Sequence, residues 1–135
     1  MATIKGFEEI EAWKKARVIA YELFEITSHG PARLDFALKD QINRSSGSVM
    51  DNIAEGFDRS GNREFIQFLS IAKGSAAETQ SQLYRLLDRQ YIDQKNFDGL
   101  HKETQSIIRL IGGMISYLKN SEFKGPKFHQ RNPKP

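Results

Sequence analysis

The sequence predicts an all-α protein, an antiparallel up-down-up-down four-helix bundle. Three observations predict it. Apolar residues recur at steps of three and four along four segments, capping and helix-breaking residues separate those segments, and no stretch alternates with period two for the length of a strand. Short connections make successive helices antiparallel neighbours. The 135 residues suit one domain, with the bundle expected over residues 1–118 and a basic flexible tail over 119–135.

The first helix is expected over residues 8–29. One face carries residues at helical spacing, namely Ile10, Trp13, Ala16, Ala20, Leu23 and Thr27. The triplet His29-Gly30-Pro31 ends the helix, because glycine accepts the left-handed conformation after the last turn and proline cannot continue the helix. The charge of His29 would suit the negative end of the helix dipole.

The second helix is expected from about Asp35 to Gly56. Its apolar stripe consists of Leu38, Ile42, Val49 and Ile53. Either Ser45 or Ser46 fills the gap in this stripe between Ile42 and Val49. The loop over 58–62 follows. Either Ser60 or Asn62 is a suitable N-cap for the next helix, because short polar side chains accept hydrogen bonds from the first backbone amides.

The third and fourth helices are expected over 63–89 and from Asp93 to 118. The third carries Phe65, Phe68, Leu69, Ala72, Ala76, Thr79, Leu83 and Leu86 at helical spacing. With Asp93 as N-cap, Ile92 and Phe97 occupy the two positions of a hydrophobic staple. The fourth helix then continues through Leu100, Thr104, Ile107, Ile111, Ile115 and Leu118.

Charge is distributed unevenly along the chain. The formal net charge is +3, but residues 119–135 hold five basic side chains and one acidic one, which leaves 15 basic and 16 acidic residues in 1–118. The body is therefore nearly neutral, whereas a protein built around a large nucleic-acid groove is more often basic throughout. The chain lacks cysteine, a signal-like N-terminus and an apolar run long enough for a membrane, which favours the cytoplasm and excludes disulfides.

A second, polar stripe runs along the second helix beside the apolar one. It consists of Gln41, Ser45, Ser48, Asn52 and Glu55 at steps of three and four, and it includes part of a run of small residues that are poor helix formers. The third helix has its own small patch around Gly74, followed by Glu78. Two interpretations stay open: the small residues allow a close crossing of two helices within one chain, or they face a partner subunit or ligand.

These residues also resemble a known family. Gln41, Arg44, Ser48, the run Asn52-Ile-Ala-Glu-Gly56 and Arg59 look like the signature of the four helix bundle protein family, also called the S23 or ribosomal-RNA intervening-sequence proteins. The later pattern with Phe68-Leu69 and Ala72-Lys73-Gly74-Ser75 matches as well, and the resemblance covers about residues 7–118. It implies four-helix subunits in a ring-like homopentamer. A relative, the accessory variability protein of diversity-generating retroelements, binds a reverse transcriptase and nucleic acid.

The sequence departs from the family pattern where two arginines and alanines are usual. Asn43-Arg44 and Ser45-Ser46-Gly47 stand there, and Met50 replaces a common proline. The small size of these residues is kept, so the close-packing role survives. One basic residue is lost, which weakens the expectation of nucleic-acid binding on that face.

The residue patterns of catalytic or metal sites are absent from the sequence. The three histidines are far apart and none has a partner at metal-ligand spacing. No serine lies in a nucleophile-elbow pattern, and Gly56–Gly61 lacks the lysine of a phosphate loop. Glu55 and Glu78 are more readily explained as ion-pair partners of nearby Arg or Lys than as acid–base catalysts. We therefore expect no enzyme activity, no cofactor and no metal.

Two functions remain. The first is a non-enzymatic oligomeric scaffold that binds RNA, DNA or a nucleic-acid enzyme such as a reverse transcriptase. The second is a structural or protein-interaction module. Candidate nucleic-acid-binding residues are Arg44, Arg59, Lys73, Lys124, Lys127, Arg131 and Lys134. Candidate helix-packing or subunit-interface residues are Gln41, Ser45, Ser48, Asn52, Glu55, Gly74 and Glu78.

Overall fold

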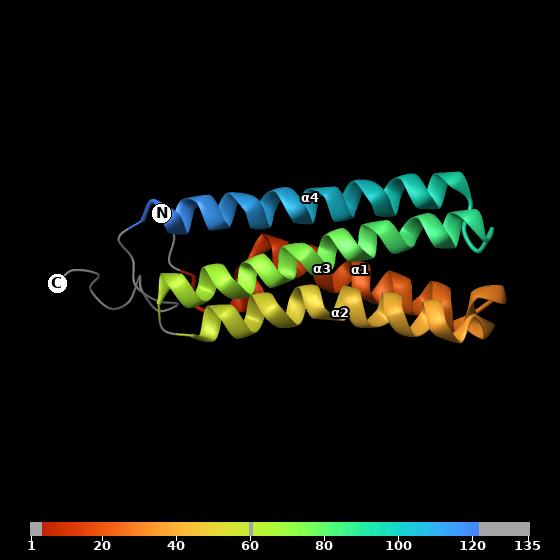
Figure 1. Cartoon of the computed structure of the whole chain (residues 1–135), viewed down its shortest axis with the longest axis horizontal. Helices are drawn as coiled ribbons and strands as arrows, with labels where there is room; N and C mark the ends of the chain where they lie inside the picture. The colour runs from red at the N-terminus through yellow and green to blue at the C-terminus, as the bar shows by residue number, and fades with distance from the viewer. Residues whose placement is uncertain (1–3, 60, 122–135) are drawn as a thin grey trace.

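The fold is the predicted bundle of four long helices. A computed structural model describes residues 4–59 and 61–121. Its helices are α1 (Glu11–Ser28), α2 (Phe36–Asp58), α3 (Asn62–Asp88) and α4 (Gln94–Lys119). Two short 3₁₀ helices, η1 (Phe7–Glu9) and η2 (Pro31–Leu34), precede α1 and α2. The helices run antiparallel in sequence order, and α4 packs against both α3 and α1, which closes the bundle (Figure 1). The described residues contain no strand.

The ends of the helices largely follow the predicted caps. The Asp35 carboxylate accepts a hydrogen bond from the Leu38 amide at the start of α2, and Asp93 accepts one from Asn96 at the start of α4. Ile92 and Phe97, the predicted staple, are both buried. Gly30 follows α1 with a φ of +64°, a conformation that glycine adopts without the Cβ penalty.

Two predicted boundaries were wrong. The first segment is not one helix over 8–29, because η1 ends before Ile10 and α1 begins only at Glu11; His29 lies just after it. The predicted side-chain cap of α3 is also absent. Gly61 is the N-cap residue and bears no side chain, while the side-chain Nδ2 of Asn62 donates to the carbonyl oxygen of Leu118. Asn62 therefore ties the start of α3 to the end of α4, and Ser60 lies outside the described residues.

The core follows the predicted stripes on α2, α3 and α4, with a rotation of α1. All four apolar stripe residues of α2 are buried, and both Ser45 and Ser46 fill the gap between them. On α1, however, Ala12 and Ile19 are buried, whereas the predicted Trp13 and Ala20 are only half-buried. Phe68 and Ile115 are half-buried as well. The buried face of α1 is thus rotated about the helix axis relative to the predicted face.

None of the helices in the described ranges combines the length and the hydropathy that a membrane span requires.

Candidate nucleic-acid interface

The two predicted basic residues of α2 and its C-terminal turn are held in local ion pairs. Arg44 Nε donates to Asp40 Oδ2 at 3.1 Å, and Arg59 Nη2 donates to Glu55 Oε2 at 2.7 Å. The hydrogen bond that Arg59 donates to Glu55 raises the pKa of Arg59 above its ordinary value. The Arg59 guanidinium also lies 5.0 Å from the centre of the Phe68 ring. Each positive charge is therefore offset by a carboxylate one turn away, and the predicted salt bridge of Glu55 is confirmed.

Lys73 differs from these arginines because it makes no ion pair within the described part of the chain. It is exposed on α3 and reaches over α4, since a Cβ placed on Gly112 would lie 3.8 Å from Lys73 Nζ. The small residues at this point of α4 thus leave room for the lysine side chain. Lys73 is the one predicted body residue whose charge is available to a ligand.

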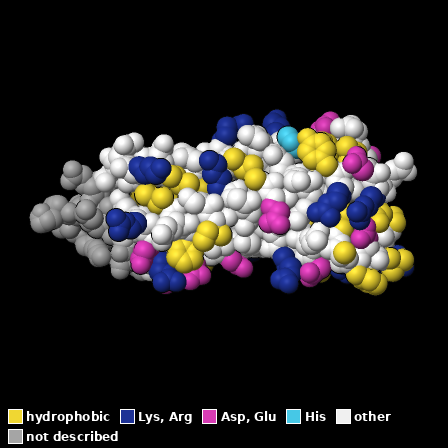
Figure 2. All heavy atoms as spheres, in the orientation of Figure 1, with side chains coloured by type: hydrophobic (Ala, Val, Ile, Leu, Met, Phe, Trp, Pro, Cys, Tyr) yellow, Lys and Arg dark blue, Asp and Glu magenta, His cyan; other side chains and the backbone are white. Residues whose placement is uncertain are grey.

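Lys73 lines a shallow groove between α3 and α4, with a volume of about 510 Å³. A second lysine, Lys119, lies on the same groove. Among the residues that the structure describes, the lining contains no acidic side chain and consists of Ser70, Lys73, Gly74, Ala77, Ile108, Ile115 and Lys119. Three other surface hollows of the described residues each include at least one glutamate. In Figure 2, dark-blue basic side chains lie beside yellow apolar ones over α3 and α4, near the end where α4 stops.

The local sequence explains why the groove exists. Gly74 and Ala77 keep the α3 wall low, and isoleucines from α4 form the opposite wall. Lys119 is the last residue of α4, where a positive charge suits the negative end of the helix dipole. The hydrogen bond from Asn62 to the Leu118 carbonyl, 3.2 Å long, holds this end of α4 against α3. Two ammonium groups over a floor of small side chains can donate hydrogen bonds to phosphate oxygens, and no acidic side chain of the described lining would repel the phosphate.

Sequence reasoning assigned Lys119 to the tail and therefore missed the groove. The signal was present, because Lys119 follows Ile115 by four residues and so continues the helical period. The other predicted basic residues, Lys124, Lys127, Arg131 and Lys134, lie outside the described residues.

The polar stripe of α2 serves mainly the contact with α3. Ser45 is buried, and its Oγ lies 2.8 Å from Thr79 Oγ1 and donates to Gln82 Oε1 at 2.6 Å. Ser75 Oγ donates to Ser48 Oγ at 2.9 Å, and the Asn52 amide donates to both Oγ and the carbonyl oxygen of Ser48. The middle of the stripe thus supports the interpretation of a close crossing within one chain.

The remaining predicted interface residues are on the surface. Gln41, Glu55, Gly74 and Glu78 are exposed, and a Cβ on Gly74 would meet nothing within 4 Å. The close crossing instead requires Gly56, which the sequence places at the end of the second helix and in the run that carries the family resemblance. A Cβ there would lie 2.6 Å from Phe68 Cβ and 3.0 Å from Phe65 Cδ1.

A second polar cluster was not foreseen. Asp35 Oδ2 accepts hydrogen bonds from Arg89 Nη1 at 2.6 Å and from the Tyr91 hydroxyl at 2.9 Å, which joins the start of α2 to the turn between α3 and α4. The hydrogen bonds from Arg89 and then Tyr91 lower the pKa of the Asp35 carboxyl, and the bond to Asp35 raises that of the Tyr91 hydroxyl. All of its bonds are made within the chain, so we assign it to stability. No group of three or more metal-ligating side chains occurs in the described ranges.

Comparison with known proteins finds one family model that matches most of the chain and a solved structure with a similar fold. The model of the 23S rRNA-intervening sequence protein family matches residues 8–113. The structure is similar to the crystal structure of a protein of unknown function from the S23 ribosomal protein family of Bacteroides thetaiotaomicron VPI-5482. The TM-score is 0.72 at 24% sequence identity, and the match covers 78% of this chain and 96% of the other. That likeness supports the fold alone. No match was found among curated proteins.

Proposed function

The chain belongs to the family of 23S rRNA-intervening sequence proteins, and from that premise we propose that it is a non-enzymatic, oligomeric scaffold that binds nucleic acid. The observation that carries the proposal is the α3–α4 groove, whose lining among residues 4–59 and 61–121 has two lysines and no acidic side chain. Phosphate contacts of this kind give affinity without reading base sequence. The proposed ligand is therefore an RNA or DNA backbone, bound without strong sequence preference.

Assembly would multiply a small contribution from each chain. Two groove lysines contact few phosphates, so a single chain would bind poorly at physiological salt. The family resemblance implies a homopentamer, and five grooves on one ring can share a strand and gain avidity without new contacts. The resemblance also suggests a nucleic-acid enzyme, such as a reverse transcriptase, as a partner on the same strand.

The test compares two double variants of the full chain. Lys73→Ala with Lys119→Ala removes the groove lysines, and Arg44→Ala with Arg59→Ala removes the same charge from residues that are already ion-paired. We expect the groove variant to weaken binding to single-stranded RNA or DNA and to reduce the salt slope by about 1.4, at about 0.7 per phosphate contact. The matched arginine variant should change the slope much less. Equal slopes in the two variants would contradict the groove as the site.

A third chain, ending at Ser121, separates the groove from the remaining basic residues. It keeps all four helices and removes Lys124, Lys127, Arg131 and Lys134. Binding that persists in this chain but is lost in the groove variant would locate the site in the bundle. If the full chain binds neither RNA nor DNA at low salt, the second candidate function, a structural or protein-interaction module, is favoured instead. The exposed apolar side chains of α1, which are Val18, Tyr21 and Phe24, would then be its first candidate surface.

A further inference from the structure

The lysine groove continues along α3 and α4 toward a pair of aromatic side chains. On α3, Lys73, Gln80 and Tyr84 follow one another at steps of seven and four, so they lie along one side of the helix. On α4, His101 precedes Lys119 by eighteen residues, about five full turns, so these two also share one side. Each helix therefore contributes one row of side chains. We call the surface from the two lysines to Tyr84 and His101 the α3–α4 track.

Contacts between the helices show that the two rows stay paired along the track. Lys73 reaches over α4 at one end. In the middle, Gln80 Nε2 donates to Gln105 Oε1 at 3.1 Å, and at the other end the Tyr84 hydroxyl lies 3.5 Å from His101 Nε2. Figure 2 shows a cyan histidine and yellow side chains on the face over α3 and α4 that also carries dark-blue side chains. The track thus passes from ammonium groups through amides to aromatic rings over about 27 Å, the length of eighteen helical residues.

The Tyr84 ring is held in place but remains exposed. The buried Phe97 contacts it with 4.8 Å between ring centres and 63° between ring planes. The His101 ring meets it nearly at a right angle, with 5.8 Å between centres. The Tyr84 residue is nevertheless 48% exposed. An exposed aromatic ring that its neighbours hold in position is a suitable stacking platform for an unpaired nucleic-acid base.

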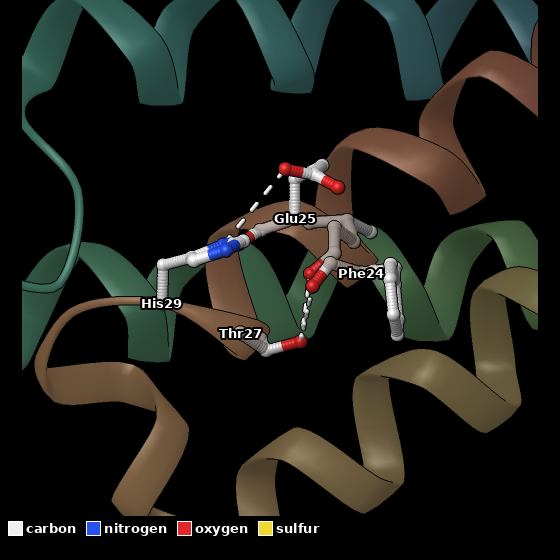
Figure 3. Close-up of polar contacts among 5 residues, drawn as sticks. Phe24, Glu25, Thr27 and His29 are labelled. Atoms are coloured by element: carbon white, nitrogen blue, oxygen red, sulfur yellow. Dashed lines mark hydrogen bonds and ion pairs between the residues drawn. The ribbon is translucent and has the colours of Figure 1, made fainter.

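His29, at the end of α1, has a different environment. Its Nδ1 lies 2.9 Å from the backbone oxygen of Glu25 and 3.8 Å from the carboxylate of the same residue, as Figure 3 shows. No aromatic ring of the described residues contacts it. His29 is therefore a matched control for His101: it is a histidine at the protein surface but outside any aromatic cluster.

The charges beside the track suit a strand that ends at the rings. Lys102 and Arg109 are exposed on α4, seven residues apart, and make no ion pair within residues 4–59 and 61–121. Glu78 is exposed on the α3 side, which favours a phosphate backbone along α4 instead. About one turn beyond the rings, Asp88 and Asp98 are both exposed. Phosphates are thus attracted between the lysines and the rings and repelled beyond them.

We propose that the α3–α4 track binds a single strand of RNA or DNA, with phosphates at the lysines and one unpaired base stacked against Tyr84 and His101. This site rests on the proposed function and narrows its ligand to a single strand, because the bases of a duplex are stacked on one another and offer no free face. Stacking on a ring tolerates every base. At 3.4 Å per nucleotide, a track of about 27 Å accommodates about eight nucleotides.

The first test measures the affinity of the full chain for single strands of about eight nucleotides, as RNA and as DNA, and for a hairpin duplex of similar length. Tyr84→Leu keeps an apolar side chain against Phe97 but removes the ring, whereas Tyr84→Phe keeps the ring. The matched control is Tyr21→Leu, which removes an exposed ring from α1.

We expect Tyr84→Leu to bind single strands at least about fivefold more weakly, since one stacked base contributes about that much or more. Its salt slope should not change, because no charge is removed. Tyr84→Phe, Tyr21→Leu and duplex binding should be nearly unaffected. Unchanged single-strand affinity of Tyr84→Leu, or an equal loss in Tyr84→Phe, would overturn the stacking site.

The second test locates the base directly. A single strand that carries 5-iodouracil is irradiated on the full chain, and the cross-linked residues are identified by mass spectrometry. We expect cross-links at Tyr84 or His101, and cross-links only at other residues, such as His29 or Tyr21, would overturn the site.

The two proposals fail in different ways. If the Lys73→Ala, Lys119→Ala variant loses salt slope while Tyr84→Leu binds normally, the groove stands and the stacking site is wrong. If the unmodified chain binds no RNA or DNA at low salt, both are wrong.

Discussion

Two regions of the molecule reverse the usual distribution of side chains. The contact between α2 and α3 is internal but polar, and the outer face of α1 is exposed but apolar. The α2–α3 contact lies inside the subunit, yet it contains hydroxyl and amide side chains that bond across it. The α1 face is exposed to solvent, yet it carries Val18, Tyr21 and Phe24. The middle of the polar stripe is used within the chain, through Ser45 and Ser48. The exposed apolar side chains instead lie on a helix that the sequence analysis assigned only to the core.

The difference has a physical basis. A hydroxyl inside a bundle is tolerated when it finds a partner, and the close approach of α2 and α3 supplies one for Ser45 and for Ser48. An exposed aromatic side chain keeps apolar surface in contact with water, and a partner that covered it would remove that unfavourable contact. The α2–α3 contact thus depends on short distances between side chains of two helices. The α1 face depends on the order of charged and apolar residues along one helix.

The largest expected effect tests how close the α2–α3 crossing is. Gly56→Ala should lower the free energy of unfolding by about 1–3 kcal/mol, because the new methyl group would collide with the Cβ of Phe68, an atom that moves only with its backbone. Gly47→Ala in the same helix has nothing within 4 Å of its Cβ and should raise it by about 0.5–1 kcal/mol. Chemical denaturation measures both. A Gly56→Ala variant that is as stable as the unmodified chain, or more stable, would show that the crossing is not close at Gly56.

The next effect concerns the buried hydroxyl of the same contact. Ser45→Ala leaves the side-chain oxygen Oε1 of Gln82 without its 2.6 Å donor, and we expect a loss of roughly 1–2 kcal/mol in the free energy of unfolding. Ser48→Ala should cost less, because Ser48 is only half-buried and water can replace its bond to Ser75. Urea denaturation of the two variants side by side would rank them. The reverse order would mean that the outer part of the stripe, not the inner part, holds the helices together.

A pH-dependent effect concerns Asp35, which joins the ends of the helices away from both regions. Its folded pKa is lowered below the ordinary value of 3.8 by its bonds to Arg89 and Tyr91. The carboxylate therefore stabilises the fold at neutral pH, and that contribution is lost as the pH falls below 3.8 through the lowered value. The melting temperature of Asp35→Asn should lie below that of the unmodified chain at pH 7 and approach it in acid. The control is Asp40→Asn, which removes the carboxylate of an exposed ion pair with Arg44. If the difference in melting temperature between Asp35→Asn and the unmodified chain stays constant with pH, the assignment is contradicted.

The smallest expected effect belongs to the α1 face. Tyr21→Ser removes a side chain that is 62% exposed, so the free energy of unfolding of the isolated subunit should stay within about 0.5 kcal/mol of the original. Thermal unfolding at the lowest measurable concentration would show this, because any self-association would add to the apparent stability at high concentration. A large loss at low concentration would mean that Tyr21 packs within its own bundle.

The sequence by itself determined the helices and most of their ends. Helical spacing, the caps at Asp35 and Asp93 and the stop at Gly30 are local features, which depend on residues within a turn or two of one another. The order of charges along α1 is equally local, and so is the step from Ile115 to Lys119 that places a lysine at the end of α4. The family resemblance is also a property of the sequence alone.

Only the tertiary structure decided how each helix is turned and how near its neighbour lies. A shift of one residue rotates a side chain by about 100° around the helix, so spacing alone did not distinguish Ala12 and Ile19 from Trp13 and Ala20 as the buried set. The need for glycine at Gly56 depends on Phe68 of the next helix. The environment of the groove lysines also depends on the tertiary structure. Whether a lysine is ion-paired is decided by the carboxylates and small residues that a neighbouring helix places beside it.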